Sequence, residues 1–82
     1  MKKILVTGGL GFIGNALIKE LLKNKNYLVY NIDKVSNVSS KDSLKKLKKN
    51  ELKRYFFSKV DIFDFNKTSK IFEKFQPDTV FN

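Results

Sequence analysis

The sequence contains no cysteine and no histidine, and these two absences exclude several kinds of chemistry. Without cysteine there is no disulfide framework and no thiolate nucleophile, and without histidine there is no His-based metal site and no histidine general base. The chain also lacks any run of the ~18 apolar residues that a membrane span needs, and its basic start reaches glycines before a signal-peptide core can form. We therefore expect a soluble cytoplasmic protein that binds no metal and no membrane.

Glycine is scarce as well, and its placement is uneven. The chain has four glycines, and all of them lie in one stretch, Thr7-Gly8-Gly9-Leu10-Gly11-Phe12-Ile13-Gly14. The apolar run at residues 3–7 predicts a buried strand before this stretch, and the spacing of apolar residues after it predicts an amphipathic helix. Strand, glycine turn and helix are the context that the dinucleotide-binding fingerprint requires.

The glycines fit that fingerprint in two ways. Gly9, Gly11 and Gly14 match the G-x-G-x-x-G form. Gly8, Gly11 and Gly14 match a wider-spaced variant, G-x-x-G-x-x-G. The early glycines allow the tight turn and let backbone N–H groups approach a pyrophosphate, and Gly14 lets the helix pack closely on the strand. The helix N-terminus would then offer unpaired donors to the phosphates. A glycine turn that holds no ligand is the alternative.

A carboxylate follows at the distance that the fingerprint expects. Asp33 lies 19 residues after Gly14, at the end of the strand-like run 27–32, where it would accept hydrogen bonds from the adenosine ribose. A carboxylate there accepts a hydrogen bond from a free 2′-hydroxyl and repels a 2′-phosphate, although the positive charge of Lys34 beside it would weaken that repulsion. We therefore expect NAD rather than NADP as the cofactor. A P-loop is excluded because Asn15 follows Gly14.

The rest of the chain alternates between predicted strands and helices. Strands are predicted at residues 3–7, 27–32, 55–60 and 79–82. One helix is predicted at residues 12–25. A second would start after a cap at Asp42 or Ser43, with Leu44 and Leu47 facing inward. A third would run from a cap at Asp64 or Asn66 to Phe75. We expect Ile71, Phe72 and Phe75 to form the buried stripe of that last helix.

The order β-α-β-α-β-α-β predicts an α/β fold with a Rossmann-type doubly wound parallel sheet. Right-handed crossovers place its strands in the order 3-2-1-4. Residues 1–82 would then form a partial NAD-binding Rossmann domain, truncated at its fourth strand, with the substrate domain absent.

Positive charge is in excess, since the formal net charge is +9 and the chain has sixteen lysines but one arginine. Most of the excess lies between Lys41 and Arg54, and residues 41–53 include no aromatic side chain. Proteins that read nucleic acids rely on arginine for bidentate contacts and on aromatic rings for stacking. We interpret the run as a solvated helix face and expect no nucleic-acid partner, with a basic nucleic-acid-associated protein as the alternative.

The residues from Lys3 to Gly14 resemble the opening of the extended short-chain dehydrogenase/reductases that act on nucleotide sugars, the NAD-dependent epimerase/dehydratase family. Within that family, three further segments look most like the dTDP-glucose 4,6-dehydratases: Asn31-Ile32-Asp33-Lys34, the approach from Arg54-Tyr55-Phe56 to Val60-Asp61-Ile62, and Gln76-Pro77-Asp78. The resemblance runs along the whole chain but covers only the opening part of such an enzyme.

The resemblance implies cofactor contacts at eight positions beside the glycines. They are the backbone amides of Phe12 and Ile13 over the pyrophosphate, Asp33, Lys34, Val35 and Ser36 around the adenosine ribose, and Asp61 and Ile62 beside the adenine. The residues themselves give Asp61 a separate case, because a carboxylate that closes the third strand can accept from the adenine amino group. A helix-capping or loop role for Asp61 is the alternative.

The implied function is that of an NAD-binding N-terminal fragment of a nucleotide-sugar dehydratase. In such enzymes NAD takes a hydride from C4 of the glucose, water leaves across C5–C6, and the hydride returns to C6, so that dTDP-glucose becomes dTDP-4-keto-6-deoxyglucose. The intact enzymes are homodimers, and their sugar site and most of their dimer interface would lie outside this chain. A fragment of a UDP-sugar 4-epimerase or decarboxylase, or a non-catalytic dinucleotide-binding module, is the alternative.

The family's catalysis is assigned to a Tyr-x-x-x-Lys pair and an acidic acid/base pair. Two matches to the first pattern occur here, Tyr30 to Lys34 and Tyr55 to Lys59. The catalytic pair needs a helix, which brings residues four apart within ~6 Å, whereas four residues on a strand span about 13 Å. Both matches lie on predicted strands, so we expect no catalytic residue in this chain.

Overall fold

The computed structural model describes residues 1–9, 11–34 and 47–81, and it confirms the predicted alternation of strands and helices. The elements are β1 (Lys2–Thr7), α1 (Phe12–Leu22), β2 (Tyr27–Asp33), α3 (Lys49–Leu52), β3 (Tyr55–Lys59), α4 (Phe65–Phe75) and β4 (Thr79–Phe81). The helix cap predicted at Asp42 or Ser43, together with Leu44, lies outside the described residues. Leu47, predicted to face inward, is partly buried against the core.

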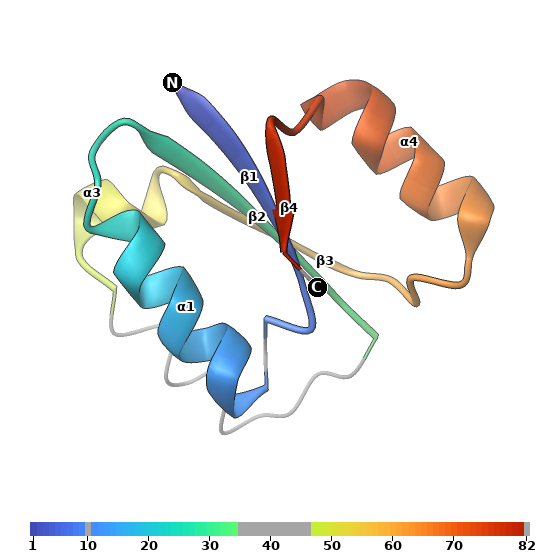
Figure 1. Cartoon of the computed structure of the whole chain (residues 1–82), viewed down its shortest axis with the longest axis horizontal. Coiled ribbons are helices and arrows are strands. Elements are labelled where there is room, and N and C mark those ends of the chain that lie inside the picture. The colour runs from blue at the N-terminus through green and yellow to red at the C-terminus, as the bar shows by residue number, and fades with distance from the viewer. Residues whose placement is uncertain (10, 35–46, 82) are drawn as a thin grey trace.

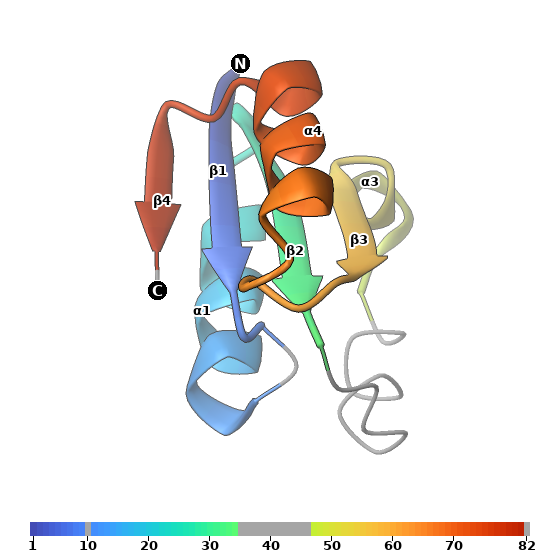
Figure 2. The same cartoon turned by 90° about the vertical axis from the view of Figure 1, so that its right-hand side faces the viewer.

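All four strands run parallel in the order β3-β2-β1-β4, as predicted, and Figure 2 shows them side by side. The register pairs Thr7 of β1 with Ile32 of β2, and Asp33 of β2 with Lys59 of β3. Because the strands are parallel, the carboxyl ends of β1, β2 and β3 lie at one edge of the sheet (Figure 2). In open sheets of this kind, that edge is where ligands bind.

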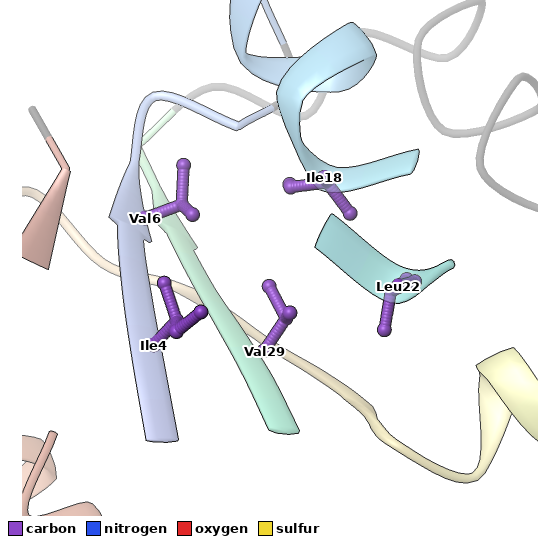
Figure 3. Packing of buried hydrophobic residues seen from close by; sticks show 5 residues of the cluster. All are labelled: Ile4, Val6, Ile18, Leu22 and Val29. Carbon is purple, nitrogen blue, oxygen red and sulfur yellow. The ribbon is translucent and has the colours of Figure 1, made fainter. Parts of the chain in front are cut away.

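The two faces of the sheet carry different helices, with α1 on one side and α4 on the other (Figures 1 and 2). The main core lies under α1, where Ile4, Val6 and Val29 of the strands meet Ile18 and Leu22 of the helix (Figure 3). Each of these side chains is at most 2% exposed. Alternation along β1 and β2 sends these strand residues to one face, and the helical period brings the two α1 residues onto it.

The predicted bounds of α4 hold, but its predicted burial is wrong. The Asp64 side chain caps the helix by accepting from the Lys67 N–H, and the chain leaves the helix through Gln76 at φ 50°. No residue of α4 is buried, and Phe72 is 37% exposed. The reason is that α4 meets the sheet through rings rather than through a closed aliphatic layer. Its Phe75 ring lies 5.2 Å from that of Tyr30 and 6.3 Å from that of Phe56.

Arg54 departs from the interpretation of the basic run as a solvated face. The residue is only 7% exposed, and its guanidinium donates to the carbonyls of Leu22, Asn24 and Tyr27 at 2.7, 2.8 and 3.0 Å. Those carbonyls lie where α1 ends and β2 begins, so the arginine ties helix to strand. The neighbouring Lys53 is exposed, as predicted.

Within the described ranges, no helix has the length and apolar character to cross a membrane.

Candidate functional site

The site begins where β1 turns into α1. The N–H of Gly8 donates to the carbonyl of Ile32 at 2.9 Å and so extends the β1–β2 ladder by one step. Gly8 then adopts φ +71°, a left-handed conformation that side chains rarely take. Its carbonyl accepts from the Gly11 N–H at 3.1 Å, which closes the turn, and the Gly11 carbonyl accepts from Asn15 as α1 starts.

Close approach explains the last glycine of the fingerprint. A Cβ built on Gly14 would lie 2.4 Å from the carbonyl oxygen of Gly8 and 2.8 Å from the Cα of Gly9. Both distances are shorter than real Cβ contacts, so only glycine fits unless the helix moves. The close approach predicted for Gly14 is therefore present, although the neighbour is the loop rather than strand β1.

Gly9 is one of the early glycines expected to let backbone N–H groups approach a pyrophosphate, but its own N–H is used within the protein. Its N–H points into the protein and donates to Oδ1 of Asn31 at 2.9 Å. A Cβ at this position would lie 2.2 Å from that same oxygen and 2.4 Å from Cδ1 of Ile18. Gly9 therefore lets the loop settle onto β2 and α1, and its N–H is not available to a phosphate.

Asn31 is a residue whose role the sequence did not reveal. It is fully buried, and while Oδ1 accepts from Gly9, Nδ2 donates to the hydroxyl of Tyr55 at 3.1 Å. The available signal was a lone amide inside the otherwise apolar run 27–32.

The Tyr55 hydroxyl that pairs with Asn31 has a raised pKa. Burial raises this pKa, the hydrogen bond from Asn31 lowers it, and the nearby Asp33 carboxylate raises it further.

The N-terminus of α1 faces the same edge of the sheet. Its cap residue is Gly11, which has no side chain to satisfy the first N–H groups, and the first turn contains no acidic residue. A helix of this length presents a partial positive charge at that end. The backbone of Phe12 and Ile13 forms this first turn, and the Ile13 side chain is 82% exposed. The geometry is therefore compatible with an anion at the predicted position.

A pocket of about 210 Å³ lies between the carboxyl ends of β1, β2 and β3. Among the predicted residues, it is lined by Gly8, Asp33, Lys34, Asp61 and Ile62. The fold thus brings together positions that lie far apart in the sequence. Val35 and Ser36, which the resemblance places around the ribose, lie outside the described residues.

A second pocket of about 480 Å³ lies beside the first and adds three more of the predicted residues. It is lined by Gly11, Ile13 and Gly14 on the helix side and by Phe81 of β4 on the other. Both pockets include Thr7 and Gly8, so they meet at the end of β1. The two together form an extended site with a carboxylate at one end and a helix N-terminus at the other.

Asp61 has the loop role that was its alternative interpretation. Its carboxylate oxygen Oδ1 accepts from the Phe63 N–H at 2.9 Å, and its carbonyl accepts from the Asp64 N–H at 2.8 Å. These bonds shape the turn before α4. Since the residue also lines the smaller pocket, the loop role and a ligand contact are compatible.

Both matches to Tyr-x-x-x-Lys start on strands, as predicted. Tyr30 lies in β2 with Lys34 just beyond it, and Tyr55 and Lys59 both lie in β3. The Tyr30 hydroxyl is hydrogen-bonded to Ser58, and that of Tyr55 to Asn31. The geometry is that of sheet residues and not of a helical catalytic pair.

Comparison with known proteins agrees with this geometry. A family model described as GDP-mannose 4,6 dehydratase matches residues 5–82. The chain is 48% identical over 80 residues to dTDP-glucose 4,6-dehydratase of Haemophilus influenzae, and 44% identical over 78 residues to that of Salmonella typhimurium. These matches cover 98% and 95% of this chain but only 23% and 21% of the two enzymes, in their N-terminal parts.

Two solved structures are also similar. The dTDP-glucose 4,6-dehydratase from Bacillus anthracis, in complex with NAD, gives a TM-score of 0.80 at 24% identity and covers 98% of this chain and 26% of that one. UDP-glucuronic acid 4-epimerase from Bacillus cereus, in complex with UDP-glucuronic acid and NAD, gives a TM-score of 0.74 at 34% identity, with 96% and 25% covered. Both of these structures hold NAD, and the first likeness, at 24% identity, shows the fold alone.

Proposed function

This chain belongs to the NAD-dependent epimerase/dehydratase family, and from that premise we propose that it is the NAD-binding part of a cytoplasmic nucleotide-sugar dehydratase that converts dTDP-glucose into dTDP-4-keto-6-deoxyglucose and water. The curated relatives support the dehydratase reaction. The chain spans less than a quarter of the length of these relatives.

The residues present fit NAD. A Cβ at Gly9 or Gly14 would clash with neighbouring atoms, so the path of the loop requires glycine at both positions. The start of α1 has no side-chain cap and offers N–H donors for a pyrophosphate. Asp33 and Lys34 would hold the adenosine ribose, and Asp61 and Ile62 would lie beside the adenine. When bound, NAD would supply reversible hydride acceptance at its nicotinamide ring. This chain's own contribution is to bind and orient the dinucleotide.

One observation carries the proposal: Asp33 lines the same pocket as Gly8, at the carboxyl ends of adjacent strands. A ligand that contacts the glycine loop with its phosphates therefore places its sugar within reach of a carboxylate. That carboxylate can accept from two ribose hydroxyls and repels a 2′-phosphate. NAD binding with discrimination against NADP follows from this arrangement.

The test is to titrate the chain with NAD and with NADP by calorimetry. We expect tighter binding of NAD, and an Asp33→Asn variant that binds NAD about tenfold or more weakly, because charge-assisted hydrogen bonds are lost, and that discriminates less against NADP. Glu73→Gln is the matched control, since Glu73 is an exposed carboxylate on α4 and should leave both affinities unchanged. Absence of NAD binding, or equal binding of NADP by the unaltered chain, would contradict the proposal.

The reaction needs a separate test. We expect the 82-residue chain to convert no dTDP-glucose when NAD is supplied, because the proposed catalytic pairs lie outside it. Mass spectrometry would detect the loss of one water from the sugar nucleotide. Turnover by this chain alone would show that the assignment of catalysis elsewhere is wrong.

A second candidate is the binding part of a UDP-sugar 4-epimerase, which is favoured by the 34% identity to the epimerase structure. The two candidates share the NAD site and differ in the sugar nucleotide. A polypeptide that joins this chain to the remaining part of the family domain would distinguish them, since epimerisation conserves mass and dehydration does not. We also propose no nucleic-acid partner, and RNA binding at low salt would refute this.

A further inference from the structure

The contact between Asn31 and Gly9 links the middle of the sheet to the glycine loop. β2 lies between β1 and β3, and Asn31 points from it toward α1, on the same face as Val29. Within the described residues, Asn31 is the polar side chain with the lowest exposure, at 0%. A buried amide is retained at a cost unless its polar atoms are hydrogen-bonded, and here both of them are.

The orientation of the amide follows from its partners. The Gly9 N–H can only donate, so the oxygen of Asn31 must face it, and the NH₂ group must then face Tyr55. The Tyr55 hydroxyl therefore accepts, and it fixes the amide from the side of β3. This defines a chain of two hydrogen bonds from β3 through β2 to the loop.

The loop is held from two sides. On one side, the Asn31 oxygen lies 2.2 Å from where a Cβ of Gly9 would be, so the amide fills the space against the loop. On the other side, Gly14 of α1 approaches the Gly8 carbonyl and the Gly9 Cα. The path of the loop is therefore set by β2 and by the first turn of α1 together.

We propose that Asn31, anchored by Tyr55, is a positioning residue that fixes the glycine loop for the diphosphate of the dinucleotide. This inference rests on the proposed function, because it assumes that the loop binds a diphosphate. Asn31 does not face the ligand, since it is fully buried. Its effect passes through the Gly9 peptide to the donors at the start of α1.

The probes are ADP, which carries a diphosphate, and adenosine, which does not. We expect Asn31→Ala to raise the dissociation constant for ADP about tenfold and that for adenosine less than about twofold, because the buried Gly9 N–H loses its partner and the loop shifts. Tyr55→Phe keeps the Gly9 contact and should give a smaller loss, about threefold for ADP. Val29→Ala is the matched control, because Val29 is equally buried on the same face of β2 and belongs to the hydrophobic core cluster under α1.

Amide hydrogen exchange gives a readout that does not depend on a ligand. We expect the Gly9 amide of the unaltered chain to be protected, and Asn31→Ala to speed its exchange while the Gly8 amide, bonded to Ile32, stays protected. An unprotected Gly9 amide in the unaltered chain would overturn the inference even if no variant folds. Equal losses for ADP and adenosine, or an equal effect of Val29→Ala, would also overturn it. If the unaltered chain binds neither NAD nor ADP, the proposed function fails, and the exchange rates still decide whether Asn31 fixes the loop.

Discussion

Gly14→Ala is the substitution for which the structure gives the sharpest expectation. The added Cβ would lie 2.4 Å from the Gly8 carbonyl oxygen, whereas ordinary contacts of this kind begin at 3.4 Å. The obstacle is backbone and not a flexible side chain, so the first turn of α1 must retreat by about 1 Å. Overpacking of this kind costs about 1–3 kcal/mol, and for a domain of this size each kcal/mol lowers the melting temperature by about 4–8 °C.

The expected result is a fall in melting temperature of about 10 °C and a loss of NAD affinity of about tenfold or more, since the helix N–H groups move with the turn. Thermal unfolding followed by circular dichroism and calorimetric titration measure the two effects. Gly11→Ala is the matched control for stability in the same loop, because Gly11 has φ −72° and its Cβ would lie 3.3 Å from the same oxygen. If the two variants melt at the same temperature, the close approach at Gly14 is not what the fingerprint requires.

Three further predictions concern residues outside the loop. Arg54→Ala should destabilise the chain by about 2–4 kcal/mol, because three backbone carbonyls lose their donor. Arg54→Lys should recover only part of that loss, because an ammonium cannot reach three carbonyls in the guanidinium geometry. Urea unfolding measures both variants. Asp64→Ala removes the α4 cap and should cost about 1 kcal/mol, while Asp64→Asn, which retains the acceptor, should cost less. Because burial raises the pKa of Tyr55 above its ordinary value of 10.0, the unfolded chain loses that proton first, so stability should fall as the pH rises beyond 10.0. Tyr55→Phe should make the fall shallower between about pH 9 and pH 11, and equal slopes would contradict the prediction.

The parts of the fold that could be predicted are those whose signals are local. The apolar run of β1, the glycines and the helical spacing of α1 are contiguous, and each constrains the backbone directly. Strand order then follows from the handedness of crossovers and needs no knowledge of side-chain contacts. For the same reason, Asp33 could be placed beside the glycine loop, because adjacent parallel strands end together.

The parts that could not be predicted depend on partners far away in the sequence. Asn31 contacts Gly9 and Tyr55 across 22 and 24 residues, and Arg54 reaches the Leu22 carbonyl across 32. A lone asparagine in a strand or an arginine in a basic run carries no mark of such a partner. Composition therefore placed Arg54 on a solvated face, although hydrogen bonds to three carbonyls offset the cost of burying its charge.

The location of the site and its precision consequently have different origins. The β1–β2 register pairs Thr7 with Ile32, so the turn at Gly8 and the carboxylate of Asp33 must emerge side by side whatever the neighbouring side chains are. Location is thus a property of topology, and many sequences with this strand order would share it. The path of the loop is a property of contacts, because Gly9 can lie against β2 only where a buried acceptor meets its N–H. A chain with the fingerprint but with an aliphatic residue in place of Asn31 would keep the location and lose the loop's fixed position.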